Sequence, residues 1–382
     1  MYNEDSYIDK NLFMELKTMF VPEKITAAEV KAKARELGAD LVGISPMSRF
    51  EGAPKQNDAR YIFPAAKSMI VLGFRIARGM FRGIEEGTLF SAYPSMGYAG
   101  MNQVYGPMVL WNLTRYLEDK GYETLPIMNS NGGEAINPVT GNFREGWSRP
   151  VAEGLPYPDV LLHFRLCAYM AGLGEIGWSK LLLTPEYGPR QRFVVLLTEA
   201  ELEGDPIFEG KICDRCKLCA HNCTSQAISK TETVKCTVAG HEIEWGKLEP
   251  MLCERGLHGG CHGQRNPFEG DYPRKYGYGR AIEGASGCMR ACMIHLEEKG
   301  VLKNKFASKF RTHKVWDDID HSKPWEMTQD AKETYADKGQ TEPHDVYSNY
   351  RVIDNFGTAK KEDVEKQQQS TKDSKTYNPL ID

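Results

Sequence analysis

The sequence lacks any run of about 18 apolar residues, the length that a membrane-spanning helix requires. It also lacks a strong charge of one sign, since 48 Lys and Arg residues stand against 52 Asp and Glu residues and leave a net charge of -4. Such a balance creates no positive field that would attract nucleic acid. We therefore expect no transmembrane segment and no nucleic-acid partner.

The N-terminal segment MYNEDSYIDKNLFMELK is charged and lacks the apolar core of a secretory signal. We therefore expect a cytoplasmic protein, in a compartment where disulfides are rare. A hydrophobic content of 41% over 382 residues is enough for one large or two ordinary domains. The ten cysteines then call for an explanation other than disulfides.

Four of these cysteines lie in the segment CDRCKLCAHNC, at positions Cys213, Cys216, Cys219 and Cys223. Their spacing, C-x2-C-x2-C-x3-C, is the one by which bacterial ferredoxins hold [4Fe–4S] clusters. In such a run the first three thiolates bind one cluster and the fourth binds a second cluster. The run therefore predicts electron transfer and a second group of cysteines downstream.

The downstream cysteines are less regular, because Ala285 stands where a ferredoxin repeat would have a cysteine before Cys288 and Cys292. Cys253 or Cys261 must then complete the set, and the choice among Cys236, Cys253 and Cys261 stays open. Our interpretation is one [4Fe–4S] cluster on Cys213, Cys216, Cys219 and Cys292, and another on Cys223, Cys253, Cys261 and Cys288. A structural zinc site is the alternative, but zinc sites usually separate two cysteine pairs by a dozen or more residues.

The segments before the cysteines predict alternating helices and strands. Thr26 and Glu29 form a capping box ahead of the helix AAEVKAKAREL, which Gly38 ends. DLVGIS, SMIVLGFRI and RQRFVVLLTEAEL read as strands, and residues 102–120 and 160–170 read as helices. We expect an α+β protein with an N-terminal extension (1–24), an α/β domain (25–205), a cysteine-rich module (206–300) and a polar tail (301–382).

A glycine-rich segment, AGLGEIGWSKLLLTPEYGPRQR, occupies residues 171–192. Gly172, Gly174 and Gly177 would let the backbone approach a bulky ligand, and Gly188 precedes Pro189 in a predicted turn. The pattern G-x-G-x-x-G also marks dinucleotide sites, but there it follows a strand. Here the preceding segment HFRLCAYM predicts a helix.

The glycine segment followed by the cysteine run resembles the corrinoid-dependent reductive dehalogenases and the related epoxyqueuosine reductases, over roughly residues 25–300. The resemblance implies a nitroreductase-like α/β domain that binds base-off cobalamin, followed by a ferredoxin-like module with two [4Fe–4S] clusters. No D-x-H-x-x-G motif is present to supply a cobalt ligand. The residues that the resemblance places at the corrin are Gly172, Gly174, Glu175, Gly177, Leu183, Thr184, Tyr187 and Gly188.

Two branches of this superfamily differ in their proton donor. Epoxyqueuosine reductases have a V-D-S-A-P-like stretch before the glycine segment. The corresponding region of this chain reads PYPDVLLHFRLCAYM and resembles that stretch only in Asp159, a possible acid. Dehalogenases instead have the pattern Y-x-x-M, then G-Y, then N. This chain resembles that pattern at Tyr105, Gly121-Tyr122 and Asn129. We therefore favour the dehalogenase branch and a small organohalide substrate.

The resemblance implies Tyr105 as the acid and Arg165 as a cation that stabilises its phenolate, because an unperturbed phenol has a pKa near 10 and donates poorly at neutral pH. Asn129 would hydrogen-bond the substrate or the corrin edge. Tyr98 and Asn131 are the alternatives to Tyr105 and Asn129. Candidate pocket residues are Phe81, Phe90, Tyr93 and Trp147.

The electron donor should be a separate ferredoxin or flavodoxin, because nothing after residue 300 resembles a fused reductase module. The other functions that fit the sequence are a corrinoid reductase acting on an epoxide or ether, and an electron carrier or corrinoid-reactivating protein. No heptad pattern indicates an oligomeric state.

Overall fold

The structure is a computed structural model of the chain and describes residues 21–129, 150–156, 158, 160–250, 252–253, 285–315 and 317. The chain divides into two units, Met1–Ile319 and Asp320–Asp382. All of the described residues belong to the first unit. No helix among them is long and apolar enough to cross a membrane.

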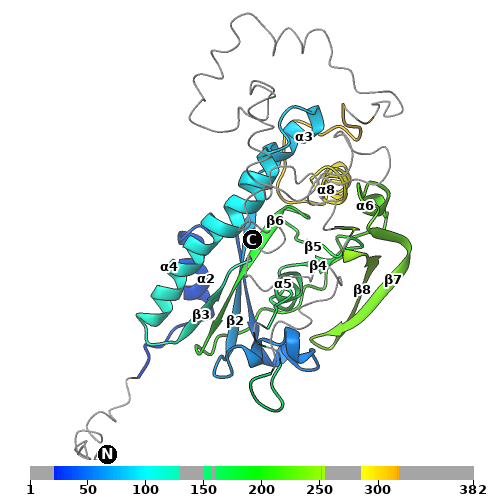
Figure 1. The fold of residues 1–382 in the computed structure, drawn as a ribbon. Helices are drawn as coiled ribbons and strands as arrows, with labels where there is room; N and C mark the ends of the chain where they lie inside the picture. Colours follow the sequence, from blue (N-terminus) through cyan, green and yellow to red (C-terminus); the bar gives the residue numbers. More distant parts are fainter. Residues whose placement is uncertain are drawn as a thin grey trace, which may run out of the picture. The chain divides into compact units, whose positions relative to one another are not determined.

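A four-stranded antiparallel sheet is the centre of the α/β part (Figure 1). Its order is β1 (Leu41–Pro46), β2 (Ser68–Arg75), β6 (Gln191–Thr198) and β3 (Thr124–Ile127). β2 and β6 pair along their full lengths, from Ser68 opposite Thr198 to Arg75 opposite Gln191. The three strands expected from the sequence are confirmed, whereas β3 was not expected. Pro126 lies in β3 at the edge of the sheet, where a residue without an N–H is tolerated.

Helices cover both faces of this sheet, which explains why its strands are apolar throughout. On one face, Ile70, Leu72 and Phe74 pack with α2 (Ala27–Glu36) and α4 (Gly106–Glu118). On the other face, Met69 and Val71 pack with α5 (Phe164–Met170), so the two sets of helices lie on opposite sides in Figure 1. The mixed α+β class is confirmed, and the nitroreductase-like assignment stays a prediction.

The predicted capping box of α2 is confirmed. Glu29 N donates to Thr26 Oγ1 at 3.2 Å, and Glu29 Oε2 accepts from Thr26 N at 2.8 Å. Gly38 follows the helix with φ +115°, a conformation that favours glycine. The helix predicted over 102–120 is α4, which continues a π-helical stretch, η5 (Tyr93–Tyr105).

Short elements connect these parts. They are the 3-10 turns η1 (Met47–Phe50), η2 (Lys55–Asn57), η3 (Ala59–Tyr61) and η4 (Arg78–Phe81), the helix α3 (Arg82–Glu86), and the hairpin strands β4 (Glu175–Ile176) and β5 (Leu182–Leu183). The cysteine-rich region contains α6 (Leu218–His221), the hairpin strands β7 (Ile228–Val238) and β8 (His241–Leu248), and α8 (Cys288–Glu298). The β7–β8 hairpin was not expected from the sequence.

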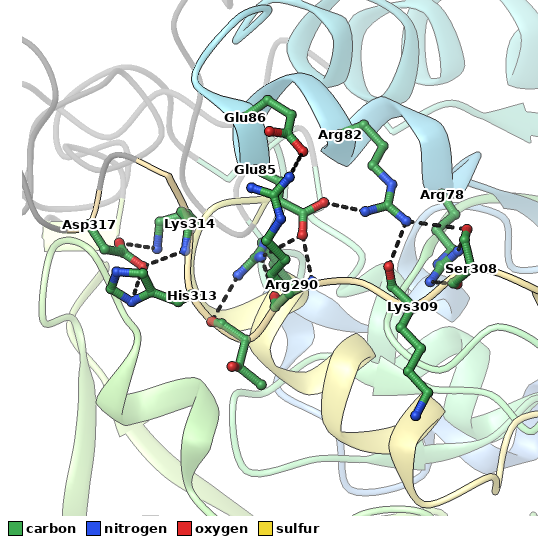
Figure 2. A network of polar contacts seen from close by, with 12 residues as sticks. Arg78, Arg82, Glu85, Glu86, Arg290, Ser308, Lys309, His313, Lys314 and Asp317 are labelled. Carbon is green, nitrogen blue, oxygen red and sulfur yellow. Dashed lines mark hydrogen bonds and ion pairs between the residues drawn. The ribbon is translucent and has the colours of Figure 1, made fainter.

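Residues 301–315, which we name the strap, contact η4, α3 and α8 within the same unit. Leu302 and Phe310 are almost fully buried. Arg78 Nη2 donates to Ser308 O at 2.7 Å and Arg82 Nη2 donates to Lys309 O at 2.9 Å (Figure 2). These contacts belong to the first fifteen residues of the predicted polar tail, and the boundary at residue 301 stays a prediction. A polar segment can pack in this way because arginines bind its carbonyl oxygens.

Glu85 lies at the centre of the contacts between the strap, α3 and α8 (Figure 2). It is completely buried, it is paired with Arg82, and its Oε1 is 3.6 Å from Arg290 Nη2. Its Oε1 also accepts a hydrogen bond from Arg311 N at 2.5 Å. One carboxylate therefore pairs with two guanidinium groups and also binds the backbone of the strap.

We expect Glu85→Gln to lower the free energy of unfolding by about 3–5 kcal/mol, because it leaves the buried Arg290 without its counter-charge. Urea unfolding of the apoprotein measures this loss. Glu232→Gln is the control, since Glu232 pairs with Lys247 on an exposed surface and should matter little. Equal effects of the two substitutions would contradict the role of Glu85.

Candidate metal centres and reaction site

The first cysteine group lies where the loop before α6 meets α8. Cys213, Cys216 and Cys219 belong to the loop and to α6, and Cys292 belongs to α8. Burial raises the pKa of the Cys292 thiol well above its usual value, and the nearby Cys219, Cys213 and Cys216 raise it further. The four thiols are therefore close enough to interact electrostatically, as the sequence predicted for one cluster.

The loop carrying this group is bound at several points. Glu175 Oε2 accepts hydrogen bonds from Ile212 N at 2.6 Å and from Cys213 N at 3.0 Å. Trp178 N donates to Cys213 Sγ at 3.4 Å. Arg215 and Lys217 have φ values of +62° and +61°, so the chain turns sharply between successive cysteines.

Asp214 joins the same loop to α8. Its carboxylate binds Lys299, lies 2.9 Å from His295 Nε2, and accepts a hydrogen bond from Cys216 N at 3.2 Å. The hydrogen bond from Lys299 is the main reason that the pKa of Asp214 lies well below its usual range. These contacts hold Cys216 and Cys292 on facing segments.

The second cysteine group lines one cavity. Cys223, Cys253 and Cys288 come from three separate segments, and the other lining residues are Arg165, Ser179, Leu181, Thr224, Ile228 and Leu248. Cys261, the fourth predicted ligand, lies outside the described residues. Cys236 does not line this cavity, because it lies on β7 opposite Ile243. The structure thus brings together the three described cysteines that we assigned to the second cluster.

The donor set fits iron–sulfur clusters. All nine described cysteines are free thiols, and seven of them belong to the two groups. Thiolates are soft ligands that suit iron–sulfur clusters or zinc. The division of one C-x2-C-x2-C-x3-C run between two groups is the arrangement of two-cluster ferredoxins and is not that of a single tetrahedral zinc site.

The glycine segment is packed against the chain's own backbone. A Cβ on Gly172 would lie 2.2 Å from Pro206 O, and a Cβ on Gly174 would lie 2.0 Å from Leu183 O. Gly177 lies against the Leu183 side chain, and Gly188 turns back to pair with Thr184. At Gly172 and Gly174 the protein's own backbone fills the space that a Cβ would take, so these glycines serve local packing, and their contact with a ligand stays a prediction.

The remaining residues predicted at the corrin also contact protein groups. Glu175 binds the cysteine loop, as described above, and the Leu183 and Thr184 side chains are buried. Tyr187 N donates to Thr184 Oγ1 at 3.2 Å, and the Tyr187 ring lies 5.9 Å from the Arg75 guanidinium. Their contacts with a corrin stay a prediction.

The predicted pair of Tyr105 and Arg165 is not formed in this structure. Tyr105 packs against Phe74 on the face of the sheet that α4 covers, and its hydroxyl donates to Gly38 O at 3.1 Å. Arg165 belongs to α5 on the opposite face, where its Nη1 donates to Lys180 O at 3.2 Å. The sheet separates the two residues, so Arg165 cannot stabilise a Tyr105 phenolate.

Asn129 lies just after β3 and donates from Nδ2 to Phe193 O at 3.1 Å. Its predicted alternative, Asn131, lies outside the described residues, as do Asp159 and Trp147. No described contact brings Asn129 to Tyr105 or Arg165.

An arginine does lie beside Tyr98, the alternative acid. The Arg192 guanidinium is 3.8 Å from the centroid of the Tyr98 ring, and its Nη2 donates to Tyr93 OH at 2.6 Å. Both tyrosines pack with Phe81 and Phe90 and with Met289 and Met293 of α8. Arg192 was not predicted from the sequence, because it stands at the start of an apolar strand beside Arg190 and nothing local connects it to the tyrosines.

Comparison with known proteins identifies related sequences. No family model matches the chain. A tetrachloroethene reductive dehalogenase of Desulfitobacterium hafniense is 40% identical over 90 residues, which is 23% of this chain and 14% of that protein. The tetrachloroethene reductive dehalogenase of Sulfurospirillum multivorans is 25% identical over 303 residues, which is 69% of this chain and 49% of the relative. The matched region thus spans half or less of these relatives.

A solved reductive dehalogenase structure, described as suggesting a mechanism for B12-dependent dehalogenation, has 19% sequence identity and a TM-score of 0.46. The likeness covers 82% of this chain and 44% of that protein. On these sequence matches, the chain is similar to reductive dehalogenases over part of their length.

Proposed function

We propose that the protein is a corrinoid-dependent reductive dehalogenase that cleaves a carbon–halogen bond of a small organohalide with electrons carried by two [4Fe–4S] clusters. The observation that carries the proposal is the convergence of seven cysteines in two groups, joined through α8. The similarity of the chain to tetrachloroethene reductive dehalogenases supports it. When bound, a cobalamin would supply low-valent cobalt as the reductant.

The two cysteine groups suggest the direction of electron flow. Cys216 of the first group is exposed, whereas Cys223 and Cys288 of the second group are buried. An external donor, which we propose to be a ferredoxin or flavodoxin, can therefore reach the first cluster more easily. Cys288 and Cys292 are four residues apart on α8, so the helix places the two clusters next to each other.

We propose Tyr98 as the proton donor, with Arg192 as the cation beside it. Cleavage of a carbon–halogen bond leaves negative charge on carbon, which takes up a proton, while the halide leaves without one. A guanidinium next to a phenol stabilises the phenolate that remains and thus lowers the pKa of the donor. Arg192 is suited to this role because its guanidinium stays charged and contacts both Tyr98 and Tyr93.

We expect Tyr98→Phe in the reconstituted enzyme to lower the rate of halide release by about a hundredfold or more, the usual contribution of a positioned acid. Tyr105→Phe is the matched variant and should have little effect, because its hydroxyl binds Gly38 O. Ion chromatography of released bromide from a brominated phenol measures both rates. A large loss of halide release in Tyr105→Phe, with a normal rate in Tyr98→Phe, would contradict the proposal and favour Tyr105 as the proton donor.

Cysteine substitutions test the ligand groups separately. We expect Cys288→Ser to remove about half of the bound iron, because it breaks the second cluster while the first remains. Cys236→Ser should retain all of the iron, since Cys236 lies on β7 away from both groups. Iron analysis after anaerobic reconstitution measures the difference. Loss of iron in Cys236→Ser alone would overturn the assignment.

A further inference from the structure

Arg165 lies at the second cysteine group and not at the tyrosines. Its side chain lines the cavity together with Cys223, Cys253 and Cys288. It is held there by the hydrogen bond from Nη1 to Lys180 O at 3.2 Å. Arg165 is in the first turn of α5, which is an unfavourable place for a cation. Helix stability therefore does not explain its position.

The surroundings of Arg165 are basic and poorly hydrated. Burial lowers the pKa of His163 to about 3, and the charges of Lys180 and Arg165 lower it further. Burial and Arg165 also lower the pKa of Lys180. Within the described part of the chain, no carboxylate forms an ion pair with Arg165 or Lys180. A partly buried positive region of this kind needs a negative group nearby.

We propose that Arg165 is a redox-tuning residue, whose positive charge at the second cysteine group holds the reduction potential of that cluster above the potential of the first. The inference rests on the proposed function, because it requires a cluster bound at Cys223, Cys253 and Cys288. It gives Arg165 a role in electron transfer in place of the role in proton transfer that the sequence predicted.

The physical basis is the charge of the cluster. A [4Fe–4S] cluster with four thiolates is anionic, and reduction adds one more negative charge. A nearby guanidinium stabilises the reduced form more than the oxidised form, especially where water is excluded. The first group has a different environment, because Asp214 lies beside Cys216 and is already paired with Lys299. The contrast favours electron flow from the exposed first cluster to the buried second cluster.

The test is a redox titration of the reconstituted full-length chain, followed by electron paramagnetic resonance without substrate. The signal of the second cluster is the one that Cys288→Ser abolishes. In Arg165→Gln we expect the ratio of reduced to oxidised second cluster at a fixed potential to fall about tenfold, which is about 59 mV for one electron. The potential of the first cluster should not change.

Arg49→Gln is the matched control, because Arg49 is also half-buried and also donates to a backbone carbonyl, that of Met170, at the other end of α5. It should leave both potentials unchanged, and Arg165→Lys should restore most of the wild-type potential. Unchanged potentials in Arg165→Gln, or an equal shift in Arg49→Gln, would overturn the inference. Loss of the second cluster in both Arg165→Gln and Arg165→Met would also overturn it, since Arg165 would then serve assembly.

Failure of the proposed function gives a different result. A wild-type chain that takes up no iron refutes the function itself. If the wild-type chain binds two clusters and their reduction potentials do not change in Arg165→Gln, only the tuning role is refuted.

Discussion

The position of α8 is the constraint on which the rest of the structure depends. One face of this helix presents Cys288 and Cys292 to two different cysteine groups, so a small rotation would misplace both. Contacts at both ends prevent such a rotation. Near its start, Arg290 is bound by Glu85 and by carbonyl oxygens of the strap. Near its end, Lys299 and His295 bind Asp214 of the cysteine loop. The contacts at the two ends of α8 thus determine whether the thiols meet.

The α/β part contributes to the same geometry. The glycine segment folds as a hairpin against its own backbone, and it brings Glu175 and Trp178 to the cysteine loop. The η5 stretch and β6 bring Tyr98 and Arg192 beside the residues of α8. The proposed proton donor and the proposed electron relay therefore lie beside neighbouring faces of one helix, as a two-electron reduction with proton uptake would require.

Local signals in the sequence predicted a large part of this structure. The capping box at Thr26, the apolar strands and the cysteine spacing depend on residues close in the chain, and the structure confirms α2, β1, β2 and β6 and brings the cysteines together. The predicted pairing of Tyr105 with Arg165 was wrong, because the sequence does not show which face of the sheet each helix covers. The contacts of the strap were not predicted either, because its polar composition gives no sign of the hydrogen bonds that distant arginines donate to its carbonyl oxygens.

The central claim is that one chain holds two clusters and a corrinoid. The direct test is to reconstitute the protein anaerobically with iron, sulfide and cobalamin and to measure iron and cobalt per chain after desalting. The account predicts about eight irons and about one cobalt per chain. About eight irons without cobalt would contradict it and would leave an electron-transfer protein, and about one zinc without iron would exclude the cluster assignment altogether.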